Sequence, residues 1–161
     1  MFGRFFSGTK YRQAGFDAAQ AVIRIADPTA PYLIRELSAK VGPFHEGLFT
    51  HVWRVFSIDY ILQNIWKKQM PREECVEFID GLISGLDPLE KKLLQSLSKA
   101  SATLHQSYSG SYPSSAYMTC MGNWLLQQME VRKASDEVDE ECGAFVVEMA
   151  RAIADRFVKS A

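Results

Sequence analysis

The segment HEGLFTHVWRVFSIDYILQNIW, residues 45–66, is the densest apolar stretch of the chain and constrains the fold most. Its polar residues recur at helical spacing within a stripe about 80° wide, which comprises Glu46, Thr50, Arg54, Ser57, Asn64 and Lys68. The rest of the circumference is mostly apolar. A helix with so narrow a polar stripe is usually packed by neighbours on most sides. We therefore predict one long helix over residues 44–69 at the centre of a helical bundle.

The same segment is long enough to span a membrane. A membrane span would have to carry charged or ionisable side chains, namely His45, Glu46, His51, Arg54 and Asp59. Charged side chains within lipid together cost several kcal/mol. We therefore expect no transmembrane segment.

Asp59 is the anomaly of this helix, since it lies about 180° from the polar stripe, among apolar residues. An unpaired buried carboxylate is costly, so we expect a hydrogen-bonding partner or a raised pKa for Asp59. On the helical wheel, His45 and Gln63 fall within about 40° of it. Gln63 is one turn further on, whereas His45 is four turns away and too distant for direct contact.

Two interpretations of Asp59 follow. In the structural one, its carboxylate bonds a helix N-terminus, a Tyr or Trp hydrogen, or an Arg from another helix, as buried polar groups usually do. In the functional one, Asp59 faces a ligand pocket inside the bundle, together with Gln63, His45 or His51. The structural interpretation is the more common outcome for such a residue.

Patterns elsewhere in the 161 residues also predict helices, and none predicts a strand. Helical spacing indicates helices over residues 10–25, from Pro31 to about 42, and from Pro71 to about 86. Asp87-Pro88-Leu89-Glu90 is close to a capping box and should start the next helix. Two further helices are expected over 115–132 and from Asp136. We predict a single all-α domain over residues 1–161, a bundle of six or seven helices.

Two segments lack this regular pattern. Residues 107–115 are rich in serine and are predicted to form a loop. Residues 1–8 contain Phe2, Arg4, Phe5 and Phe6, an aromatic and basic combination that suits a partner groove or peripheral contact with a membrane surface. The alternative is an arm that folds back onto the core or is disordered.

Charge and cysteine content narrow the classes of protein. The formal net charge is −1, which argues against nucleic-acid binding. Residues 1–70 carry a balance of +4 and residues 71–161 a balance of −5. The three cysteines, Cys75, Cys120 and Cys142, are odd in number and lack metal-ligand spacing, so we expect a reducing, cytoplasmic location.

The sequence contains no motif that identifies a catalysed reaction. The histidines form no pair at i,i+3 or i,i+4, and no glycine-rich phosphate loop occurs. We therefore predict neither a metal site nor a cofactor. The leading hypothesis is a non-enzymatic helical protein-interaction module, of the adaptor, chaperone or regulator type, that self-associates or binds another protein. The alternative is a bundle that binds a small molecule or metal around Asp59, either as a binding protein or as an enzyme.

Overall fold

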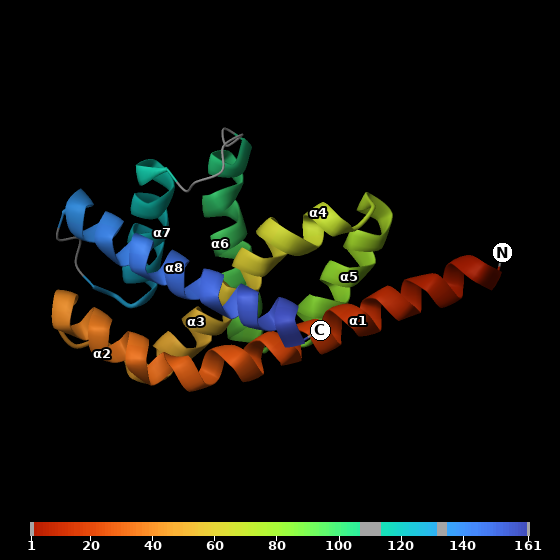
Figure 1. Ribbon diagram of the computed structural model, residues 1–161, viewed down its shortest axis with the longest axis horizontal. Coiled ribbons are helices and arrows are strands. Elements are labelled where there is room, and N and C mark those ends of the chain that lie inside the picture. The colour runs from red at the N-terminus through yellow and green to blue at the C-terminus, as the bar shows by residue number, and fades with distance from the viewer. Residues whose placement is uncertain (1, 107–113, 132–134, 161) are drawn as a thin grey trace.

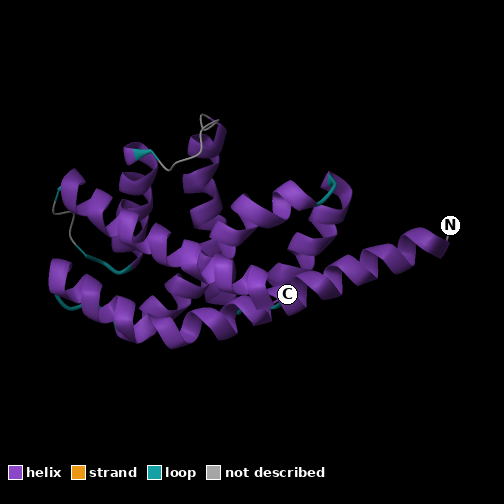
Figure 2. Ribbon diagram, viewed as in Figure 1, coloured by secondary structure: helices purple, strands orange, loops and turns teal. Residues whose placement is uncertain are grey.

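The computed structural model describes the backbone of residues 2–106, 114–131 and 135–160, and the side chains of residues 10–101, 114–131 and 135–160. The residues so described contain no strand, so the prediction of an all-α fold is confirmed (Figures 1 and 2). The elements are α1 (Phe2–Ala26), the 3-10 turn η1 (Asp27–Thr29), α2 (Ala30–Val41), α3 (Glu46–Ile61), η2 (Leu62–Trp66), α4 (Lys67–Gln69), α5 (Arg72–Ser84), α6 (Pro88–Gln106), α7 (Ser115–Gln128) and α8 (Asp136–Ser160).

The predicted central helix is present as a continuous helical run over residues 46–69, made of α3, η2 and α4. α3 packs against α1, α2, α6 and α8. Trp53 is fully buried and Trp66 is 4% exposed, so this run lies in the interior as expected. The run starts two residues later than predicted, because the Nδ1 atom of His45 accepts a hydrogen bond from the Leu48 amide at 3.0 Å and caps the helix.

A π-helical turn, η2, interrupts this run at Leu62–Trp66, where the sequence pattern predicts a regular α-helix. A π turn inserts one residue and rotates the following side chains relative to α3. The side chain of Asn64 donates a hydrogen bond of 2.8 Å to the carbonyl oxygen of Tyr60, a backbone acceptor next to this turn. The helical wheel drawn from α3 therefore does not apply unchanged beyond Ile61.

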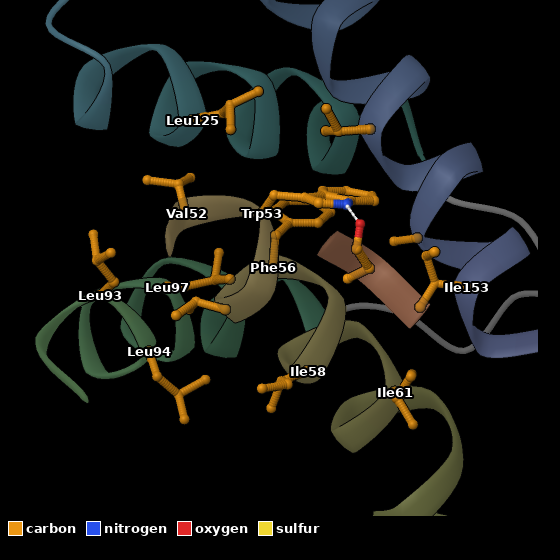
Figure 3. Packing of buried hydrophobic residues seen from close by; sticks show 14 of the residues in the cluster. Val52, Trp53, Phe56, Ile58, Ile61, Leu93, Leu94, Leu97, Leu125 and Ile153 are labelled. Carbon is orange, nitrogen blue, oxygen red and sulfur yellow. Dashed lines mark hydrogen bonds between the residues drawn. The ribbon is translucent and has the colours of Figure 1, made fainter. Parts of the chain in front are cut away.

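The core forms one cluster with members from α1, α2, α3, α5, α6, α7 and α8. Figure 3 shows the ring of Trp53 stacked on Phe56, with a centroid separation of 6.2 Å, between residues of the neighbouring helices. The Trp53 indole N–H donates to the carbonyl oxygen of Ala26 at 3.2 Å and to Thr29 Oγ1 at 2.9 Å. The polar atom of this large core side chain is thus hydrogen-bonded to the α1–η1 corner, as buried Trp requires.

Two helix pairs approach so closely that glycine is required at the crossing. In the α1–α5 pair, a Cβ on Gly15 would overlap the Phe78 carbonyl, and one on Gly81 would overlap the Arg12 carbonyl. In the α7–α8 pair, Gly122 faces the Asp139 carbonyl in the same way.

The capping box predicted at the start of α6 is confirmed by a reciprocal pair of hydrogen bonds. The Glu90 amide donates to Asp87 Oδ1 at 2.8 Å, and the Asp87 amide donates to Glu90 Oε1 at 3.2 Å. Ser114 caps α7 through the Tyr117 amide at 3.1 Å, so the predicted serine-rich loop ends at Ser114. Residues 107–113 of that loop lie outside the described residues. Within the described part of the chain, no helix combines the length and apolar character needed to cross a bilayer.

Candidate functional site

The carboxylate of Asp59 is buried, as the sequence predicts, with 3% of the residue exposed. Its Oδ1 atom accepts hydrogen bonds from Gln63 Nε2 at 3.3 Å and from Ser98 Oγ of α6 at 3.2 Å. Burial raises the pKa of Asp59 to about 6, and the two hydrogen bonds partly offset this rise. The expected partner Gln63 is therefore found, whereas Ser98 was missed.

A chain of hydrogen bonds connects Asp59 to the protein surface. Lys67 Nζ, on the exposed first residue of α4, donates to Gln63 Oε1 at 3.0 Å, and Gln63 in turn donates to Asp59. On the interior side, burial raises the pKa of the Tyr117 phenol well above its usual range, and the charge of Asp59 adds to this rise. Asp59 is thus held by a polar network that joins α3, η2, α4 and α6.

The sequence analysis grouped two histidines with Asp59, but neither of them contacts it in the structure. His45 is exposed and its ring caps α3, at the opposite end of that helix. His51 is half-buried and its Nδ1 lies 3.0 Å from Glu90 Oε2 and 3.3 Å from Asp87 Oδ2. Of the three residues that the functional interpretation offers beside Asp59, Gln63 contacts it, whereas His45 and His51 lie elsewhere. A ligand site around Asp59 stays a prediction.

His51 instead belongs to a second polar network, the α3–α6 cluster, which comprises Asp27, His51, Arg54, Asp87 and Glu90. Arg54 makes a two-pronged ion pair with Asp27, with both N···O distances at 2.7 Å, and its Nη1 lies 3.2 Å from Glu90 Oε2. These partners hold the pKa of Arg54 above its usual range. Glu90 is buried, so its carboxylate depends on this network and on the α6 cap for hydrogen bonds.

The α3–α6 cluster also brings together three metal-ligand types. One ligand atom each from His51, Asp87 and Glu90 lies within 4.8 Å of the others. The Arg54 guanidinium, however, donates to the same Glu90 oxygen that a cation would need. A second positive charge at that oxygen is electrostatically unfavourable. The residues therefore fit an ion-pair network that ties the start of α6 to α3 and η1 better than they fit a metal site.

The aromatic and basic residues Phe2, Arg4, Phe5 and Phe6 have side chains outside the described residues, so their predicted role in partner binding stays a prediction. The backbone differs from the expected arm, since α1 already begins at Phe2 rather than near residue 10. Figure 1 shows that the first turns of α1 extend beyond the other helices.

The cysteines offer little nucleophilic chemistry. Cys75 and Cys142 are buried, and Cys120 is half-buried with its thiol 3.8 Å from the Ala100 carbonyl oxygen. Burial raises the pKa of both Cys120 and Cys142. A raised pKa keeps these groups as thiols at neutral pH, and the thiol is a poor nucleophile.

Comparison with known proteins adds no family assignment. No protein-family model matches the chain, and no curated protein or solved structure matches it either.

Proposed function

We propose that this protein is a non-enzymatic helical interaction module, of the adaptor, chaperone or regulator type, which binds a second protein chain through the first turns of α1. The observation that carries the proposal is the position of residues 2–10. They continue α1 past the point where its packing partner α5 begins, and Figure 1 shows this end of α1 projecting from the molecule.

Among the side chains that the structure describes, the polar contacts of α1 with α5 begin at Tyr11 and Arg12. Glu74 in the first turn of α5 raises the pKa of the Tyr11 phenol, and Arg12 Nη2 lies 3.6 Å from Asp80. Further along, Gln20 Nε2 donates to the Gly85 carbonyl at 3.0 Å. The nine residues before Tyr11 correspond to about 13 Å of helix. A helical segment of that length gains little stability from itself, so packing against a partner would stabilise it.

The sequence of this projecting segment suits such a partner. Phe2, Phe5 and Phe6 follow the i, i+3, i+4 spacing that helices use when they insert anchors into an apolar groove. Arg4 adds a positive charge in a half of the chain whose balance is +4. The acidic second half of another copy would complement that charge, which makes self-association the simplest form of the proposal.

The test compares the full chain with a variant that lacks residues 1–8. Light scattering coupled to gel filtration reports self-association, and affinity capture reports other partners. We expect the truncation to weaken self-association or capture at least tenfold, while circular dichroism loses only the signal of the deleted residues. Val158→Glu places a charge on an exposed apolar residue of α8 and is the matched control. Unchanged association after truncation, or vesicle binding without protein association, would contradict the proposal.

The alternative site around Asp59 is less well supported. Gln63 and Ser98 already hydrogen-bond the Asp59 carboxylate, while His45 and His51 are engaged elsewhere. A structural role accounts for every one of these contacts.

A further inference from the structure

A histidine ring holds the start of α3, at the turn that connects it to α2. His45 is the N-cap residue of α3, and its Nδ1 accepts a hydrogen bond from the Leu48 amide at 3.0 Å. A backbone N–H can only donate, so Nδ1 carries a lone pair and the ring is neutral, with its proton on Nε2. The usual N-cap residues are serine, threonine, aspartate and asparagine, which all keep their acceptor between pH 5 and pH 8.

Protonation of the ring would remove this cap in two ways. An imidazolium carries a proton on both nitrogens, so Nδ1 of His45 could no longer accept from the Leu48 amide. The first turn of a helix also carries a partial positive charge, which disfavours a cation at that position. Histidine is the side chain that ordinarily changes its charge between pH 5 and pH 8. The cap of α3 is therefore chemically sensitive to mild acid.

The charged groups at this turn do not hold the protonated ring in place. His45 is exposed, and among the described residues the histidine that forms ion pairs is His51. Lys40, in the last turn of α2, lies 3.6 Å from Glu141 of α8 and is paired there. Glu46, the first residue of α3, is exposed, and an exposed carboxylate stabilises a neighbouring cation only weakly.

A second contact holds the same turn and does not titrate. Phe44 precedes the cap, and its ring centroid lies 5.6 Å from that of Phe49 in α3. This is the spacing of a hydrophobic staple, which joins the residue before the cap to the fourth residue of the helix. Phe49 is fully buried and Phe44 packs against the core. The staple should keep the turn docked on the core when the cap is lost.

We propose that His45 is a proton-sensitive cap, and that protonation of its ring opens the first turn of α3, residues 46–48, while the rest of the bundle stays folded. α2 ends independently of this cap, because the Gly42 amide donates to the Ser38 carbonyl oxygen at 2.9 Å. Figure 1 places the turn between α2 and α3 at the end of the molecule opposite the N-terminus. The device is thus separate from the proposed contact of α1.

Two NMR measurements on the ¹⁵N-labelled full chain test the proposal. Long-range ¹H–¹⁵N spectra of the imidazole rings report the tautomer, and we expect the proton of His45 on Nε2 at pH 7.5. Amide exchange with water, divided by the exchange rate of an unstructured peptide at the same pH, reports opening of the first turn. Protection of the Leu48 amide should fall at least about fivefold from pH 7.5 to pH 5, in step with protonation of His45.

Two variants and an internal control make the test specific. His45→Asn supplies a cap that does not titrate, so Leu48 should be equally protected at both pH values. His45→Ala has no cap, so Leu48 should already be poorly protected at pH 7.5. The Val138 amide, which donates to Ser135 Oγ at the exposed start of α8, is the control and should keep its protection.

Three results would overturn the proposal. The first is a His45 ring with its proton on Nδ1 at pH 7.5. The second is protection of Leu48 that does not change with pH in the wild type, or that falls only as much as that of Val138. The third is a pH dependence at Leu48 that persists in His45→Asn, since another group would then cause it.

Discussion

The hydroxyl group of Ser98 on α6 lies 3.2 Å from Oδ1 of Asp59 on α3, and this hydrogen bond joins two helices at a buried carboxylate. The pKa of Asp59 is about 6 in the folded protein, against 3.8 as its ordinary value. Below pH 3.8 both the folded and the unfolded state hold the proton. Between pH 3.8 and about 6 the folded state holds more of it, so the free energy of unfolding should fall as the pH rises.

Asp59→Asn tests this linkage because it removes the titration and keeps an oxygen that can accept from Ser98. The wild type should lose on the order of 3 kcal/mol relative to the variant between pH 4 and pH 7. Urea unfolding at several pH values measures the difference, and other titrating groups cancel between the two proteins. A constant difference across this range would show that Asp59 does not titrate as described.

Asp59→Ala separates the structural from the functional interpretation. It leaves the donors of Gln63 and Ser98 without their acceptor, so we expect a loss of about 2 kcal/mol in the free energy of unfolding. Association through the first turns of α1 should be unaffected, because the backbone of these turns extends beyond the other helices, α3 included (Figure 1). Native mass spectrometry of the wild type that reveals a ligand or metal lost in both Asp59 variants would favour the functional interpretation instead.

Glu90→Ala should be among the more destabilising substitutions of a charged residue. It removes one half of the α6 capping box and the partner of both His51 and Arg54, and Glu90 is only 3% exposed. We expect a loss of about 2–4 kcal/mol in thermal or urea unfolding. Glu46→Ala, on the same helix face as Arg54 but exposed, is the control and should change stability by less than about 0.5 kcal/mol. Equal losses of stability in Glu90→Ala and Glu46→Ala would mean that the network around Glu90 does not stabilise the fold.

The close helix crossings predict that Gly→Ala substitutions at different positions have very different effects on stability. Gly81→Ala and Gly122→Ala would each push a methyl group into a backbone carbonyl of the neighbouring helix and should prevent native packing. Gly47→Ala lies on an exposed turn of α3, where the nearest atom is 3.2 Å away on the flexible His45 ring, so it should be neutral or slightly stabilising. Calorimetry of the three variants measures the contrast. A stable Gly122→Ala protein would contradict the close approach of α7 and α8.

The three tryptophans Trp53, Trp66 and Trp124 are at most 5% exposed. Iodide should therefore quench their fluorescence very little in the folded protein and strongly in urea. Free quenching of the folded protein would contradict the interior position of the run over residues 46–69.

The sequence predicted the features that depend on residues close to one another along the chain. The capping box at Asp87 and Glu90 depends on residues three positions apart, and the burial of Asp59 follows from its position on the α3 wheel. Partners on other helices could not be predicted, because His51 and Glu90, for example, are 39 residues apart and meet only through the packing of α6 on α3. Ser98 was missed for the same reason, since it is 39 residues from Asp59 along the chain.

Errors in the candidate site have equally physical causes. His45 was grouped with Asp59 because both point in similar directions on the helical wheel, whereas the ring of His45 caps the N-terminus of α3. The π turn at Leu62–Trp66 has no sequence signal, since one inserted residue changes neither composition nor apolar spacing enough to detect.

Site-specific photocrosslinking tests the central claim, association through the first turns of α1, most directly. Benzoylphenylalanine in place of Phe5 retains an aromatic ring and should form crosslinks to a second copy or to a discrete partner protein, whose site mass spectrometry then identifies. The same group at Gln95, an exposed residue of α6, is the control and should remain largely uncrosslinked. Equal crosslinking from positions 5 and 95, or none from position 5 in cell extract and at high protein concentration, would contradict the account.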